Sequence, residues 1–197
     1  MLENTDLYGA TYYLQEHKID DAYEKVVGEV VEKIIIQEKE ISGKNVKSEM
    51  SFGNFLNLLG LNLGIEAGLN KENVKSTEVS KKLSYQNKLI ITLKAMEKEG
   101  KCCDIKSLRQ DQNPAKYIYF EGDADFCLIE GKPEQFLVKG NVEKYEFKSY
   151  CSKEYIRSAS IRDFLNEGGT FPIFCAGYIM RQRENNLDLT LYYIGGP

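Results

Sequence analysis

An alternating stretch in the first half of the chain constrains the fold most. From Leu59 to Leu69 an aliphatic residue stands at every odd position, and the even positions hold three glycines, one asparagine and one glutamate. A period of two over this length predicts a β-strand with one aliphatic face and one nearly bare face. Because an aliphatic face has to be covered, we expect a Gly-rich amphipathic β-hairpin within residues 42–83.

Two interpretations of this hairpin stay open. In the first, the strand belongs to the main sheet and a helix covers it, with the glycines allowing close backbone approach. In the second, the hairpin changes partner, and either inserts into a membrane or pairs with another subunit. The binding residues expected on its aliphatic face are Leu59, Leu61, Leu63, Ile65 and Leu69.

The rest of the chain changes from helical to strand patterns along its length. Apolar residues at steps of three and four predict one helix from Ile19 to Ile35 and another from Ser84 to Glu99. In the second half, β-forming runs separated by turn residues predict strands and one short helix. The helix is expected at 154–165, and the strands at 117–121, 125–130, 136–142, 145–149, 174–181 and 187–194.

These elements together predict an α+β fold, in which two main helices pack on a largely antiparallel β-sheet. Residues 1–100 form the α-rich half with the hairpin insert at 42–83, residues 101–197 form the β-rich half, and one compact unit is expected. The core is expected to include Val27, Val31, Leu89, Leu93, Phe126, Leu128, Phe136, Val138, Tyr178 and Leu191.

Charge and cysteine content narrow the classes of function. The formal net charge is −4, whereas a dedicated nucleic-acid binder usually carries a basic excess. Nucleic-acid binding through a local basic patch is the alternative that stays open. The five cysteines are irregularly spaced and the acidic N-terminus lacks the apolar run of a signal peptide, so we expect reduced thiols in the cytoplasm. No apolar stretch reaches the roughly 20 residues of a membrane-spanning helix.

Few residues have the types and spacing that catalysis requires. The single histidine, His17, stands between a glutamate and a lysine and is typical of a solvated surface residue. Asp123 and Asp125 resemble half of a Mg²⁺ site, but the glycine before them favours a turn and no third acid is placed to help. We therefore predict no catalytic residue, no metal site beyond this weak pair, and no cofactor.

The order of these features resembles an uncharacterised bacterial family of cytoplasmic proteins, a domain of unknown function. Its members open with an aromatic-Tyr-Leu strand and a helix, continue with a Gly- and Ser-rich insert and a helix ending in Glu-Gly, and close with a β-rich half. The matching positions are 12–14, 19–20, Tyr23, 42–83, 99–100, 122–123 and Phe126. This sequence departs from the pattern at Gln15, where the family has an acid. The resemblance implies a bacterial accessory protein encoded near defence or mobile-element genes, and no catalytic residue.

The function expected from the sequence is a non-enzymatic binding or interaction module of a bacterial assembly, with a protein partner or self-association. One alternative is a membrane-acting effector that uses residues 52–69. Another is an enzyme that acts on a nucleotide or nucleic acid through Asp123 and Asp125.

Overall fold

The structure is a computed structural model, and it describes residues 9–26, 28, 83–108 and 116–196. The chain divides into two compact units, one made of Met1–Lys18 with Met96–Pro197 and the other of Ile19–Ala95.

The larger unit is built on a seven-stranded sheet formed by the described residues. In chain order its strands are β1 (Thr11–Leu14), β2 (Cys102–Asp104), β3 (Tyr117–Leu128), β4 (Gln135–Val142), β5 (Tyr145–Ser152), β6 (Thr170–Arg183) and β7 (Asn186–Gly195). Its helical segments between the strands are η2 (Ile105–Ser107), η3 (Lys153–Tyr155) and α5 (Ala159–Glu167).

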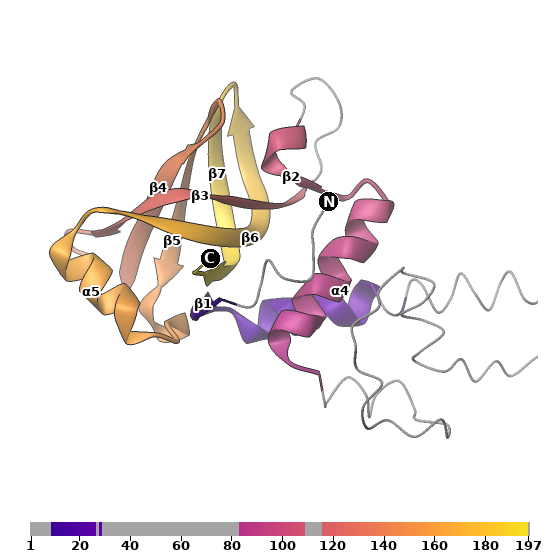
Figure 1. Cartoon of the computed structure of the whole chain (residues 1–197), viewed down its shortest axis with the longest axis horizontal. Coiled ribbons are helices and arrows are strands. Elements are labelled where there is room, and N and C mark those ends of the chain that lie inside the picture. Colours follow the sequence, from indigo (N-terminus) through magenta and orange to yellow (C-terminus); the bar gives the residue numbers. More distant parts are fainter. Residues whose placement is uncertain (1–8, 27, 29–82, 109–115, 197) are drawn as a thin grey trace, which may run out of the picture. The chain divides into compact units, whose positions relative to one another are not determined.

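Five of the strands close into a barrel (Figure 1). Antiparallel pairs join β3 to β4 and β4 to β5, a parallel pair joins β5 to β7, and antiparallel pairs join β7 to β6 and β6 back to β3. Within the ring, the long strand β3 pairs with two strands: its residues 123–128 pair with β4 and its residues 117–125 pair with β6. Outside the ring, β1 pairs with β7 and β2 pairs with β3.

Alternation in the sequence sets the inner and outer faces of this barrel. In β5, the side chains from Tyr145 to Cys151 are buried at every second position, and those between them are exposed. Close approach of the strands depends on Gly140 in β4, where a Cβ atom would collide with the backbone oxygen of Asp123 and press on the ring of Phe147. A residue without a side chain therefore lets the sheet bend tightly enough to close.

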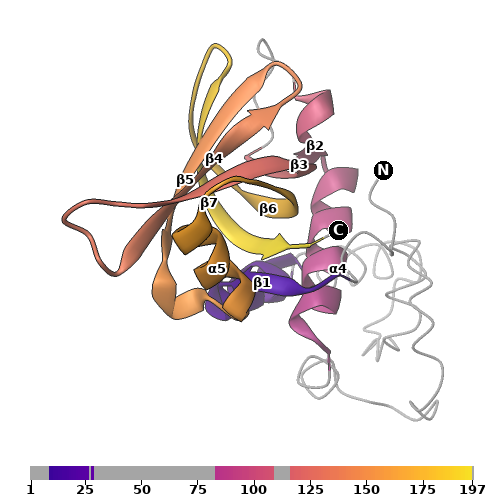
Figure 2. The same ribbon diagram turned by 60° about the vertical axis from the view of Figure 1, so that its left-hand side comes forward.

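The helix α5 covers one end of the barrel. Its Ile161 is fully buried in the barrel core, and Phe164 and Leu165 pack against that core. The tips of the β4–β5 and β6–β7 hairpins lie at the other end (Figures 1 and 2). The ring order β3-β4-β5-β7-β6, with a parallel β5–β7 pair and a helix between β5 and β6, is the connectivity of an OB-fold, a five-stranded Greek-key barrel.

The smaller unit contains most of a helix over residues 16–26 and most of α4 (Tyr85–Lys98). The Nζ atom of Lys88 lies 2.6 Å from a carboxylate oxygen of Asp20 and 5.1 Å from the centre of the Tyr85 ring. This ion pair and cation–π contact compensate for burying a lysine on the apolar face of α4. Among the described residues, no helix has the length and apolar character needed to cross a bilayer.

The predicted α+β fold, with two main helices packed on a largely antiparallel β-sheet, is wrong: a closed barrel dominates the structure. Two of the predicted strands, 117–121 and 125–130, are parts of the single strand β3, which runs straight through Gly122. Because β3 was split, the sequence did not show that one long strand pairs with both β4 and β6. The Gly-rich hairpin of 42–83 lies outside the described residues.

Several local predictions are confirmed. The helix expected at 84–99 is α4, and the expected closing hairpin is β6 with β7. The core residues found buried as predicted are Leu89, Leu93, Phe126, Phe136, Val138 and Leu191. Leu128 is the clear error, because it lies at the end of β3 and is 59% exposed. Tyr178 is half-buried, and Val27 and Val31 lie outside the described residues.

Candidate ligand-binding surface on the barrel

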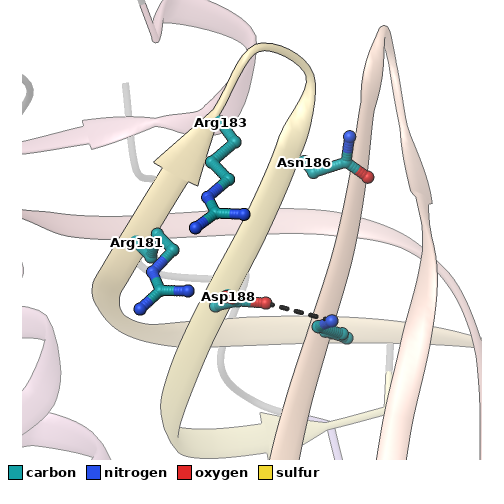
Figure 3. A pocket seen from close by; sticks show the side chains of 5 residues that line it. Arg181, Arg183, Asn186 and Asp188 are labelled. Atoms are coloured by element: carbon teal, nitrogen blue, oxygen red, sulfur yellow. Dashed lines mark ion pairs between the residues drawn. The ribbon is translucent and has the colours of Figure 1, made fainter.

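A shallow depression of about 320 Å³ lies on the outer surface of the barrel, where β5, β7 and β6 run side by side (Figure 3). We call it the arginine pocket, and its lining residues are Lys148, Arg181, Arg183, Asn186 and Asp188. All five side chains come from strands, so the barrel itself fixes their positions. Rigid strands hold binding groups more accurately than loops do.

Strand pairing arranges these side chains in two rows. Lys148 lies opposite Asp188, which in turn lies opposite Arg181. Two residues nearer the hairpin tips, Asn186 lies opposite Arg183. Neighbouring strands are about 4.8 Å apart and alternate residues about 7 Å apart, so the two guanidinium groups can reach the same ligand group. Figure 3 shows both arginines on the same side of the hairpin as Asn186 and Asp188.

The charge of the arginine pocket is only partly neutralised. Lys148 Nζ lies 3.4 Å from Asp188 Oδ1, and both side chains are well exposed, so this pair contributes little to stability. Within the described ranges, no acid forms an ion pair with either Arg181 or Arg183. Arginine presents a planar fork of donors that matches carboxylate and phosphate oxygens, so the pocket can bind an anionic group.

An exposed aromatic ring lies on the same face of the barrel. Tyr150 is the next outward residue after Lys148 on β5, and it is 58% exposed. It lies opposite Leu137 of β4, and Lys132 places its Nζ atom 5.6 Å from the centre of the ring. We call these residues, Lys132, Leu137 and Tyr150, the tyrosine face. A flat ring with a cation nearby can stack against a planar ligand group.

A lysine pair joins the tyrosine face to the arginine pocket. Lys139 of β4 and Lys148 of β5 are directly opposite each other, and both are exposed. Like charges in opposed positions of a sheet are destabilising. An anionic ligand lying across β4 and β5 would relieve this repulsion.

The two predicted acidic candidates lie on the outer face of β3. Asp123 is exposed, and Asp125 is half-buried and accepts a 2.7 Å hydrogen bond from the Thr170 hydroxyl. Both belong to a continuous strand, so the turn expected around Gly122 is wrong. Asp125 lies opposite Lys139. No group of three potential metal-ligating side chains occurs among the residues that the structure describes.

The other sequence candidates contribute nothing to this surface. The aliphatic residues of 59–69 and the whole of 52–69 lie outside the described residues, so the hairpin and the membrane-acting alternative stay predictions. His17 is exposed and its ring lies 5.4 Å from that of Tyr155, centre to centre. All five cysteine thiols are free, and three of them, Cys102, Cys151 and Cys175, are buried.

Sequence analysis missed the arginine pocket, although one signal was present. Arg181 and Arg183 are two of only five arginines in the chain, and they stand two positions apart at the end of a predicted strand. Period two places such residues on one face of a strand, so a shared site could have been inferred. The third contributor, Lys148, could not be identified, because it is brought in by the long-range pairing of β5 with β7.

Comparisons with known proteins add no relative: no family model, no curated protein and no solved structure matches this chain.

Proposed function

We propose that the barrel is a non-enzymatic binding module for single-stranded nucleic acid. The arginine pocket binds phosphate groups, and a base stacks on Tyr150. The observation that carries the proposal is the position of Tyr150 one outward step from Lys148, which puts a stacking ring and a cationic pocket on one face. Nucleic acid repeats this combination of planar base and phosphate, and proteins bind it with rings beside a positive groove.

The connectivity of the barrel supports the same ligand class by analogy. OB-folds bind oligonucleotides on the face of their second and third strands and on the loops after the first and fourth strands. These are β4, β5, the β3–β4 loop that contains Lys132, and the β6–β7 tip beside Arg183. A fold hosts many functions, so the analogy is secondary to the side chains themselves.

The overall charge of −4 gives no general attraction for nucleic acid, so only the cations of this local surface contribute to the affinity. The counterion release that drives binding depends on the phosphates actually neutralised, not on net charge. We therefore expect modest affinity and a weak dependence on salt.

Binding is tested by fluorescence anisotropy with labelled 15-nucleotide oligothymidylate and oligouridylate at low salt. Arg181→Gln/Arg183→Gln should weaken binding at least 10-fold, since each lost charged hydrogen bond contributes about 1.5–3 kcal/mol. Tyr150→Leu should weaken binding about 5- to 100-fold through the lost stacking. The matched control is Lys106→Gln/Lys153→Gln, which removes the same charge from η2 and η3 and should leave binding within 2-fold.

An acidic peptide of equal length serves as the competing ligand. Weak binding of this peptide and strong binding of the oligonucleotides support the proposal. Equal losses in the pocket variant and the control would contradict it, because bulk charge alone would then explain binding. Preference for the peptide, with no effect of Tyr150→Leu, would instead assign the pocket to an acidic segment of a protein partner.

A further inference from the structure

The cationic surface of the barrel ends abruptly on three sides. The arginine pocket and the tyrosine face are flanked by acids that the strands and turns place around them. These flanking acids are Asp123, Asp125, Glu130, Glu134, Glu143, Glu146 and Glu184. Six of them are exposed, and Asp125 is half-buried.

Toward the hairpin tips the boundary is formed by Glu143, Glu146 and Glu184. Glu146 lies opposite Asn186 in the same row as Arg183. Glu143 and Glu184 occupy the β4–β5 and β6–β7 turns, where their φ angles of 54° and 49° are the left-handed conformation found in tight turns. Lys144 lies beside Glu143 in the β4–β5 turn, with its Nζ atom 5.3 Å from the centre of the Tyr145 ring. A phosphate moved beyond Arg183 toward these tips would therefore meet three carboxylates and one cation.

Toward β3 the boundary follows the next strand. Asp125 lies opposite Lys139 and Asp123 lies opposite Asn141, so acids follow on the strand next to the Lys139 cation. At the other end of the surface, Glu130 and Glu134 lie on either side of Lys132 in sequence. The β3–β4 connection thus supplies a single cation between two exposed acids.

The area inside this boundary is small. From Tyr150 on β5 to Arg183 on β6, the two ends of the surface lie four residues apart along the strands and two strand spacings apart, about 13 Å by 10 Å. Its diagonal of about 16 Å accommodates about five nucleotides stacked at about 3.4 Å each. On the strands inside it, Lys139, Arg181 and Arg183 form no ion pair with a described acid, so they can neutralise about three phosphates.

We infer that the ligand is a short unpaired segment, such as a strand end or a loop of up to about five nucleotides, and not a long continuous single strand. The inference rests on the proposed function, because it concerns the length of the strand that the same surface binds. The flanking acids repel the phosphates that precede and follow the bound segment. Additional nucleotides therefore add no contacts.

The salt dependence of binding distinguishes additional phosphate contacts from the larger number of binding registers on a longer strand. A 15-nucleotide homopolymer offers more binding registers than a 5-nucleotide one and should bind roughly 10-fold more tightly for that reason alone. The slope of log K against log salt concentration counts phosphate contacts, at about −0.7 per contact for single strands. We expect a slope of about −2 for both lengths. A slope steeper by one unit or more for the longer strand would overturn the inference.

A charge variant tests the boundary directly. Glu146→Gln/Glu184→Gln opens the surface toward the hairpin tips, and should increase the affinity for the 15-nucleotide strand at least 3-fold more than that for the 5-nucleotide strand. The control Asp163→Asn/Glu167→Gln removes two exposed acids from α5, at the opposite end of the barrel, and should change both affinities equally. Equal gains in both variants would also overturn the inference.

The two proposals fail differently. Absence of oligonucleotide binding by the wild-type chain would remove the proposed function. Binding by the wild-type chain with a slope that steepens with length would leave that function in place and remove only the short-segment inference.

Discussion

The buried hydroxyl of Tyr193 contributes unfavourably to the stability of the barrel unit. The residue is 1% exposed, and no described residue gives its Oη atom a hydrogen-bond partner. By contrast, the Tyr145 hydroxyl, on an equally buried residue, donates a 2.8 Å hydrogen bond to the carbonyl of Leu108. A desolvated polar atom without a partner costs about 1–3 kcal/mol, whereas a satisfied one is close to neutral or favourable.

Tyr193→Phe should therefore raise the free energy of unfolding by about 1 kcal/mol, and Tyr145→Phe should lower it by a similar amount. In a chain of this size the melting temperature should shift by about 2–4 °C in each direction. Urea unfolding followed by circular dichroism measures both variants. A loss of stability in Tyr193→Phe equal to that in Tyr145→Phe would contradict the argument.

At the scale of elements, α5 is stable only because it packs on the end of the barrel. A helix of nine residues is marginal in isolation, even with Ser158 accepting a hydrogen bond from the Ser160 amide and Gly168 ending it at a φ of 68°. The ring of Phe164 stacks on Phe171 with centres 3.8 Å apart, and also lies 5.5 Å from the ring of Phe126.

Phe164→Ala should destabilise the fold by about 2 kcal/mol, because the ring is half-buried and its removal loses burial and ring packing. Ser158→Ala should cost about 1 kcal/mol through the lost cap. The exposed Asn166 of the same helix provides the control, and Asn166→Ala should stay within about 0.5 kcal/mol. Chemical denaturation at neutral pH ranks the three; equal effects of Phe164→Ala and Asn166→Ala would show that α5 does not support the barrel.

At the scale of the whole molecule, buried thiols make the free energy of unfolding decrease as the pH becomes alkaline. Burial raises the pKa of Cys151 to about 12, and burial also raises the pKa of Cys175 well above its usual value. In the unfolded chain these thiols ionise near pH 9, whereas in the folded chain they stay neutral. The stabilisation is therefore complete below pH 9 and is lost as the pH rises from 9 toward 12.

Thermal unfolding at pH 8, 9, 10 and 11 should show a melting temperature that falls progressively above pH 9. Each pH unit in this window removes up to about 1.4 kcal/mol per thiol. Cys151→Ala should show a shallower decline, because one of the titrating groups is absent, whatever its stability at pH 8. A decline as steep as that of the wild type would exclude Cys151 as a contributor.

The sequence by itself determined the local elements and their faces. Alternation marks the inner and outer positions of β5, and the turn residues between the predicted strands separate β4 from β5 and β6 from β7. These signals depend only on near neighbours, because side-chain direction follows from backbone period alone. They were wrong around Gly122, where the turn that Gly and Asp favour is absent and Asp123 and Asp125 lie within the continuous strand β3.

Only the tertiary structure decided how these elements combine. Period two fixes which side chains point inward but not which strand lies alongside, so neither the parallel β5–β7 pair nor the return of β6 to β3 could be predicted. The same pairings bring Lys148 to Arg181 and put Tyr150 on their face. Both the barrel and its candidate binding surface depend on contacts between residues far apart in the chain, which no local pattern encodes.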